Sequence, residues 1–180
     1  MEAHHTLDKK FIWSHPSQHR NRLTNKYEPL QPYILAELAK AFKAKTFIDV
    51  GANIGFYSIV MAEEINAENV LAFETMPAPF EELQKNIEIN GLNEKIKAFQ
   101  IAISSERGAA EIEVISELSG ANALANSSIH SEKTHSRIET VETAPLSDFA
   151  EVAKKTIALK IDVEGHEREV ISGARRVLIK

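Results

Sequence analysis

Three acidic residues each stand at or near the end of a short apolar run: Asp49, Glu74 and Asp162. The runs are rich in β-branched residues and show no alternation, which is typical of strands buried on both faces of a parallel sheet. In an open sheet of this kind, ligands bind at the carboxyl ends of the strands. We therefore expect the three carboxylates to lie at a ligand-binding edge.

The first run continues into a glycine loop, residues 49–55 (DVGANIG). Gly51 and Gly55 allow a tight turn and a close approach to a ligand, which a Cβ atom would obstruct. The dinucleotide fingerprint G-x-G-x-x-G is absent, because Asn53 and Phe56 occupy its second and third glycine positions. A nicotinamide or flavin cofactor is therefore disfavoured. The structural alternative is that the two glycines only end a strand and begin a helix.

Glu74 indicates which ligand the loop could hold. The second strand of such folds presents a carboxylate to ribose hydroxyls at about this position. Together with the acid in the first strand, it favours a nucleoside that is cationic and lacks phosphates. S-adenosylmethionine has these features, namely a sulfonium, an ammonium and a ribose diol.

Three segments resemble motifs of the FkbM family of S-adenosylmethionine-dependent methyltransferases. Residues 47–58 (FIDVGANIGFYS) resemble its opening motif, and residues 72–74 with the following Pro, Phe, Leu and Asn positions to 86 resemble its second motif. Residues 160–167 (KIDVEGHE), with Val170 and Gly173 beyond, resemble its most distinctive signature. Their order and spacing fit, and the resemblance covers about residues 46–175.

The resemblance implies a class I methyltransferase fold and methyl transfer to a hydroxyl, often on a sugar or a polyketide-type natural product. It implies that Glu74 holds the ribose diol and that Ala102 borders the adenine. It also implies a cofactor loop and a group of residues beside the transferred methyl; the loop residues are Asp49, Gly51, Ala52, Asn53 and Gly55, and the group beside the methyl is Asp162, Glu164 and His166.

A hydroxyl acceptor must lose a proton, and His166 is the natural base because an unperturbed imidazole titrates near pH ~6.5. The resemblance does not say which of the three residues acts. Structural alternatives stay open. His166 could be an exposed histidine in the first turn of the last helix, and Asp162 could be the N-cap of that helix. Glu164 and Glu167 could be charges that favour the N-terminus of the same helix.

Length and composition limit the function classes. The chain has 180 residues, 26 acidic against 21 basic, and a formal net charge of −5. One domain and no nucleic-acid partner are expected, since phosphate binding requires clustered positive charge. The absence of cysteine excludes disulfides, thiolate zinc sites and cysteine nucleophiles. No apolar run suits a membrane span and the first eight residues are too polar for a secretory signal, so we expect a cytoplasmic protein without membrane contact.

The elements that must position these residues follow from apolar spacing. An N-terminal arm is expected over 1–28, and an S-adenosylmethionine-binding domain over 29–180. The domain should hold strands at 46–50, 70–74, 96–103 and 156–163, a half-buried strand at 110–115 whose residues alternate cleanly, and a less regular strand at 138–143. Helices are expected from the prolines at 29 and 32 to about 43, over 54–65, over 78–90 and from 166 to the end; the first has one apolar face, formed by Ile34, Leu35, Leu38, Ala41 and Phe42.

This order predicts an α/β fold with a Rossmann-like, doubly wound, mostly parallel sheet and helices on both faces. Family members usually add strands after the last helix, so the domain looks C-terminally short. The strand at 157–163 would then lie at a sheet edge, which could bind a second copy of the chain, the N-terminal arm or nothing.

The leading hypothesis is an S-adenosylmethionine-dependent O-methyltransferase acting on a small hydroxylated acceptor. The first alternative is a catalytically inactive cofactor-binding module of the same fold, and the second is an oxidoreductase, which Asn53 and Phe56 disfavour. No metal site is expected. The acceptor cannot be identified from the loop at 116–136, whose Gly120, Ala121 and Asn122 are candidate contacts.

Overall fold

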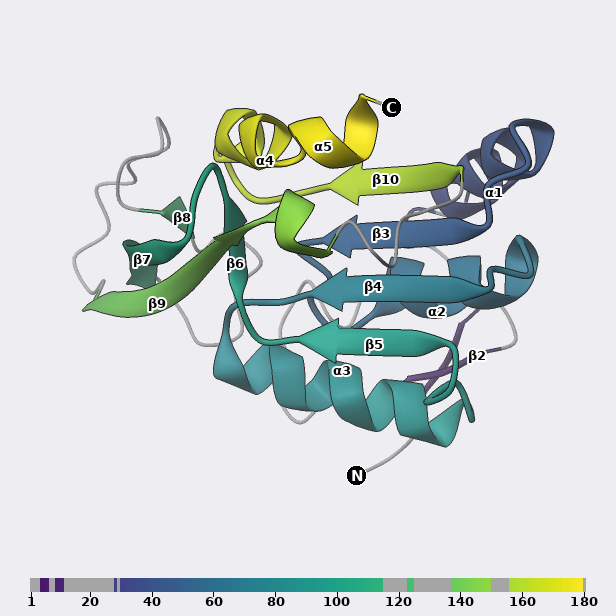
Figure 1. Ribbon diagram of the computed structural model, residues 1–180. Helices are drawn as coiled ribbons and strands as arrows, with labels where there is room; N and C mark the ends of the chain where they lie inside the picture. Colours follow the sequence, from purple (N-terminus) through teal and green to yellow (C-terminus); the bar gives the residue numbers. More distant parts are fainter. Residues whose placement is uncertain are drawn as a thin grey trace.

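The computed structural model describes residues 4–6, 9–11, 28, 30–114, 123–124, 137–149 and 156–179. Its centre is a parallel sheet with the strand order β10-β3-β4-β5 (Figure 1). The strands are β3 (Thr46–Val50), β4 (Asn69–Phe73), β5 (Ile96–Phe99) and β10 (Ile157–Ile161). The predicted strands at 46–50, 70–74 and 156–163 are confirmed.

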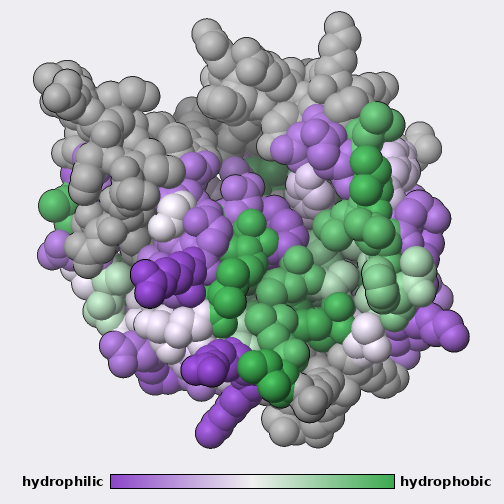
Figure 2. Space-filling view, turned by 90° about the horizontal axis from the view of Figure 1, so that it is seen from above, coloured by the Kyte–Doolittle hydropathy of each residue, from purple (hydrophilic) through white to green (hydrophobic). Residues whose placement is uncertain are grey.

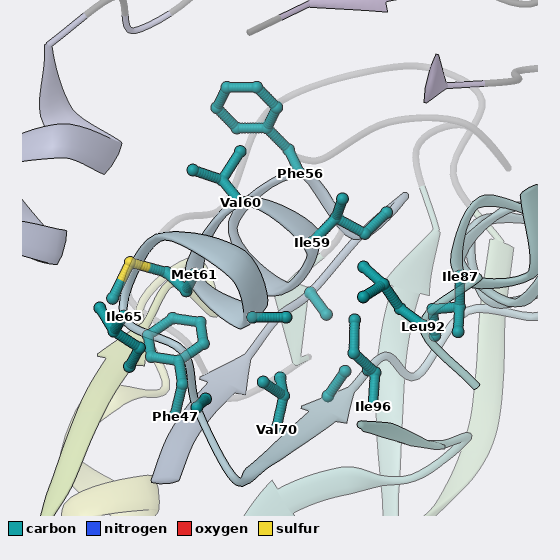
Figure 3. Close-up of a cluster of buried hydrophobic side chains, with 14 of the residues drawn as sticks. Phe47, Phe56, Ile59, Val60, Met61, Ile65, Val70, Ile87, Leu92 and Ile96 are labelled. Carbon is teal, nitrogen blue, oxygen red and sulfur yellow. The ribbon is translucent and has the colours of Figure 1, made fainter. Parts of the chain in front are cut away.

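Helices cover both faces of this sheet, as predicted. One face packs against α2 (Phe56–Glu64), α3 (Pro77–Ile89) and α1 (Gln31–Ala41). Phe47 and Val70 point into this layer (Figure 3). The opposite face packs against α4 (Glu167–Gly173), α5 (Arg175–Leu178) and a 3-10 turn (Leu146–Phe149) through Ile48 and Val50. This two-residue alternation divides the core into two layers.

The run at 96–103 does not form one strand. It divides into β5 and β6 (Ala102–Ser104), and the two strands belong to different sheets. The second sheet has the order β6-β9-β7-β8, with β7 (Gly108–Val114), β8 (Ala123–Leu124) and β9 (Arg137–Pro145). The single-strand prediction is wrong because the apolar run continues through the bend at which the chain leaves the central sheet. The strands predicted near 110–115 and 138–143 are confirmed as parts of β7 and β9.

The apolar face predicted for the first helix is not the buried one. Ile34, Leu38 and Phe42 are 57%, 53% and 74% exposed, whereas Ala36 and Ala39 are 1% and 4% exposed. Small side chains allow a close approach between α1 and α2, so the helix packs through its alanines. Figure 2 views the molecule from above Figure 1, from the side on which α1, α4 and α5 lie, and shows hydrophobic residues gathered on that surface.

The described parts of the N-terminal arm form a hairpin of β1 (His4–Thr6) and β2 (Lys9–Phe11). Phe11 is 1% exposed and lies 5.8 Å from the ring of Phe56. Phe11 therefore anchors the hairpin against α2, and residues 12–27 lie outside the described residues. Most of the loop at 116–136, with Gly120, Ala121 and Asn122, also lies outside them. Within the described part of the chain, no helix has the length and apolar character needed to cross a bilayer.

Candidate functional site

A pocket lies at the carboxyl ends of β3, β4 and β10, where the three acids were expected to meet. Of the predicted site residues, Gly51, Glu74, Ala102, Asp162 and His166 line it. Five others do not line it: Asp49, Ala52, Asn53, Gly55 and Glu164. The remaining lining is largely apolar and comes from β3, β4, β6, β7 and the segments next to β4, β6 and β10: Val50, Phe73, Thr75, Ile101, Ile103, Ile112 and Val163.

Gly51 allows the ends of β3 and β10 to approach closely. Its φ is +80°, and a Cβ atom placed there would lie 1.9 Å from the carbonyl oxygen of Asp162. The N–H of Gly51 donates to the carbonyl of Phe73 at 3.0 Å, and the N–H of Asp162 donates to the carbonyl of Val50 at 3.0 Å. Glycine at this position is therefore required by both the backbone conformation and the available space.

Glu74 is fixed by main-chain donors on two sides. Its carboxylate accepts the N–H of Asn53 at 2.8 Å through Oε2 and the N–H of Met76 at 2.9 Å through Oε1. Burial raises the pKa of Glu74, while these N–H groups and Lys160 act in the opposite direction. Each carboxylate oxygen can accept a further hydrogen bond, so the side chain can still bind a diol.

The glycine loop is also fixed from α3 and by its own backbone. Asn86, fully buried, donates from Nδ2 to the carbonyl of Ile54 at 2.9 Å. Asn53 has φ +50°, and its buried Oδ1 has no hydrogen-bond partner among the described residues. Gly55 is the N-cap of α2 with φ +89°, and a Cβ there would lie 2.6 Å from Leu83. For Gly55, the structural alternative of a helix start therefore matches what is seen.

Asp49 lies below the pocket and is completely buried. Ser58 donates its hydroxyl to Oδ2 at 2.7 Å, and the Nζ of Lys160 lies 3.2 Å from Oδ1. Burial lowers the pKa of Lys160, but the carboxylates of Asp49 and Asp162 more than offset this, and the pKa is raised above its ordinary value. The lysine is therefore charged. Sequence reasoning missed it, although a lysine inside an apolar strand was a visible signal.

His166 lies between two polar side chains. Its Nε2 is 3.0 Å from the hydroxyl of Ser104 in β6, and its Nδ1 is 3.5 Å from a carboxylate oxygen of Glu169. Burial lowers the pKa of His166, and the carboxylates of Glu169 and Glu167 only partly offset this. With 14% of its side chain exposed, it is not the exposed histidine of the structural alternative. A largely neutral imidazole beside an acid can accept a proton near neutral pH.

Tight helix packing brings His166 to Ser104. A Cβ on Gly173 would lie 2.0 Å from the carbonyl oxygen of Ser104, so only glycine allows α4 to approach β6 this closely. Neither Ser104 nor this contact follows from the sequence, because the partners are far apart in the chain.

The acidic residues near the start of α4 differ in their surroundings. The N-cap of α4 is His166, and no side chain caps it, so the N-cap alternative for Asp162 is wrong. The Asp162 side chain is 68% exposed and faces Lys160 at 3.6 Å. Burial raises the pKa of Glu164, and the charges of Asp162 and Glu167 raise it further. Glu167 accepts the N–H of Gly165 at 3.1 Å, and the backbone N–H groups lower its pKa, as expected for a charge at a helix start.

The chain is similar to several known proteins. A family model described as "Methyltransferase FkbM domain" matches residues 49–180. Methyltransferase sdnD of Sordaria araneosa is 29% identical over 152 residues, which cover 70% of this chain and 59% of that protein. Hexuronic acid methyltransferase AglP of Haloferax volcanii is 29% identical over 150 residues, which cover 82% of this chain and 57% of that protein.

A solved structure agrees with the fold. Methyltransferase FkbM from Methylobacillus flagellatus KT superposes with a TM-score of 0.52 at 16% identity, covering 91% of this chain and 42% of that one. The chain spans less than two thirds of the curated relatives, 59% and 57% of the two named above. Because the family model covers well over half of the chain, from the third residue of the first predicted motif through the other two, the chain belongs to the FkbM family of methyltransferases.

Proposed function

We propose that the chain forms the S-adenosylmethionine-binding part of a methyltransferase that acts on a hydroxyl group. The observation that carries this proposal is a single pocket that joins a backbone-held Glu74 to His166 across Gly51. One end of that pocket suits a ribose diol, and the other holds a base.

The residues present fit this cofactor. Glu74 would hold the ribose hydroxyls, and Ala102 with its neighbour Ile101 offers an apolar surface to the adenine. Gly51 lets the backbone of Asp162 lie against the glycine loop, where a Cβ would be 1.9 Å from the Asp162 carbonyl oxygen, and the exposed carboxylate of Asp162 suits a cationic ligand. When bound, S-adenosylmethionine supplies an electrophilic methyl group.

The protein's own contribution is orientation and proton removal. His166, neutral because burial lowers its pKa, would take the proton of the acceptor hydroxyl. Glu169, 3.5 Å from Nδ1, would stabilise the imidazolium that results. A positioned base of this kind contributes about 10²–10⁴-fold to rate, and orientation of the reactants can supply more.

For the acceptor we propose a hydroxylated sugar or natural product. Support comes from the relative named as a hexuronic acid methyltransferase. Sugar acids are therefore the first acceptors to test.

The test is calorimetric titration of the folded chain with S-adenosylmethionine and S-adenosylhomocysteine. We expect saturable binding, which Glu74→Gln weakens by about tenfold or more, or about 1.4 kcal/mol, because glutamine can accept only one of the two N–H groups. The matched control is Glu81→Gln on the exposed surface of α3, where the side chain is 69% exposed. Absence of binding by folded wild-type protein would contradict the proposal. Binding without transfer to any acceptor would favour the alternative of a cofactor-binding module.

A further inference from the structure

Lys160 connects three groups at the floor of the pocket. Its Nζ donates to the carbonyl oxygen of Gly51 at 2.9 Å, and lies 3.2 Å from Asp49 Oδ1 and 3.6 Å from Asp162 Oδ2. These groups belong to the end of β3, the glycine loop and the end of β10. Lys160 stands opposite Asp49 in the register of the two strands, so the ammonium lies where the strands end.

The surroundings keep this ammonium in place. Its side chain is 16% exposed, and its Nζ lies 5.3 Å from the centre of the Tyr57 ring. Tyr57 in turn donates its hydroxyl to the carboxylate of Glu28. With an aromatic ring on one side and two carboxylates on the other, the ammonium has favourable partners in several directions.

Lys160 completes the fixation of Gly51. The N–H of Gly51 is held by the carbonyl of Phe73 at 3.0 Å, and its carbonyl is held by Lys160. Asp162, which lines the pocket with Gly51, has Lys160 as its cationic neighbour. Both lining residues therefore depend on one side chain that does not itself line the pocket.

We infer that Lys160 is a positioning residue for the cofactor, which fixes the Gly51 carbonyl and orients the Asp162 carboxylate toward the pocket. This inference rests on the proposed function. It adds a residue that acts through the wall of the pocket rather than by touching the ligand.

The variants must separate positioning from stability. Lys160→Met alone would leave Asp49 buried without its counter-ion, which is strongly destabilising. The informative comparison is therefore Asp49→Asn against the double variant Asp49→Asn with Lys160→Met. The first retains the ammonium beside Gly51 and Asp162, and the second removes it without leaving a buried unpaired charge. Circular dichroism and thermal unfolding establish that both are folded.

The first measurement is the dissociation constant for S-adenosylmethionine and for S-adenosylhomocysteine. Loss of positioning should weaken both ligands by about tenfold or more in the double variant relative to Asp49→Asn, because both share the nucleoside and amino-acid parts. A folded double variant that binds both as well as Asp49→Asn would overturn the inference. So would tighter binding of S-adenosylmethionine alone, since this would show that Lys160 acts only as a charge opposing the sulfonium.

Chemical rescue provides a conservative replacement. The chain has no cysteine, so Lys160→Cys in the Asp49→Asn background can be alkylated by 2-bromoethylamine at that position alone, which restores an ammonium of nearly lysine length. Binding of both ligands should return to within about threefold of Asp49→Asn. Failure of a fully alkylated, folded protein to recover would count against positioning by the ammonium.

A second measurement needs no ligand. The chain has seven glycines, so protein labelled with ¹⁵N-glycine shows few amide signals. The Gly51 amide should exchange its proton at least about tenfold faster in the double variant. The Gly91 amide, where a Cβ would meet no atom within 4 Å, serves as the internal control. If wild-type protein binds no S-adenosylmethionine, the proposed function fails, while this exchange still decides whether Lys160 fixes the loop. Unchanged Gly51 exchange would overturn the inference.

Discussion

The two sides of the pocket are held in different ways. On the β4 side, Glu74 is 9% exposed and both of its oxygens accept main-chain N–H groups. On the β10 side, the Asp162 side chain is 68% exposed, and the charge that faces it is a lysine side chain 3.6 Å away. Main-chain donors cannot rotate away, whereas side chains can. The β4 side is therefore rigid before a ligand binds, whereas the side chains on the β10 side can adjust.

The positions of the strands explain this difference. β4 has a parallel neighbour on each side, whereas β10 pairs only with β3 in the described sheet. All five residues of β10 are only partly buried. A rigid binding site lowers the entropic cost of binding, so the proposed cofactor would be bound mainly through the β4 side.

The largest effect should come from Gly51→Ala, which breaks the junction between the two sides. A Cβ there lies 1.9 Å from a backbone oxygen at φ +80°, so we expect the free energy of unfolding to fall by about 3 kcal/mol and cofactor binding to be lost. Urea denaturation and calorimetry measure the two effects. Gly91→Ala is the control, since it shares a positive φ but has open space and should cost only about 1–2 kcal/mol. Equal costs for the two variants would contradict this explanation.

His166→Gln should separate the two sides. We expect kcat to fall by about 10²–10⁴-fold while the dissociation constant for S-adenosylmethionine changes by less than about threefold, because in the proposed mechanism the imidazole acts on the acceptor. Methyl transfer to a hexuronic acid measures the first quantity, and calorimetry measures the second. Arg168→Gln, an exposed change in the same helix, should alter neither. A parallel loss of cofactor binding would place His166 on the cofactor side.

Ser104→Ala should have a smaller effect on the same side. It removes the partner 3.0 Å from Nε2 of His166, and a neutral hydrogen bond of this kind contributes about 0.5–1.5 kcal/mol. We expect turnover to change by up to about tenfold, together with a shift in the pH dependence of the His166 ring signals in NMR spectra. Ser172→Ala, on the exposed surface of α4, is the control. No change in the titration of His166 would mean that the serine does not orient the ring.

The smallest effect is a difference in the pH dependence of stability. Burial lowers the pKa of His166, so its contribution to stability is present above the unfolded value of about 6.5 and is lost as the pH falls through the folded value. Burial raises the pKa of Glu74 above 4.5, so its contribution is present below 4.5 and is lost as the pH rises through the folded value. The loss of unfolding free energy caused by His166→Gln, measured against wild type, should therefore grow as the pH rises. The loss caused by Glu74→Gln should grow as the pH falls. Parallel curves would contradict the assigned shifts.

Sequence patterns predicted the parts of the fold that are determined locally. β3 and β4 were recognisable because a strand buried on both faces is continuously apolar, and the acids at their ends marked the ligand edge. The first helix shows the limit of this reasoning. Its large apolar residues, such as Leu38, marked a face that is exposed, because contact with α2 is made by Ala36 and Ala39. Periodicity identifies a helix, but the size of the neighbouring surface decides which face is buried.

The candidate site was predictable only where a motif is contiguous. Glu74 and His166 could be found from their local sequence. Ser104 could not, because it reaches His166 only when α4 packs on β6 through Gly173. Lys160 was part of a quoted motif, yet its contact with the Gly51 carbonyl arises from strand pairing across a separation of 109 residues. Asp49 shows the converse, because its motif suggested a ligand contact and the fold buries it below the pocket.

The separation between β3 and β10 also has a consequence for synthesis. Ribosomes add about 5–20 residues per second, so the 109 residues that separate Gly51 from Lys160 take roughly 5–20 seconds to appear. During that interval β3, a central strand of the finished sheet, has one edge with no partner, and Asp49 has no lysine beside it. Open strand edges of this kind favour aggregation. The nascent chain therefore carries the carboxylate of Asp49 without its lysine until β10 leaves the ribosome, and this is the period in which a chaperone would matter most.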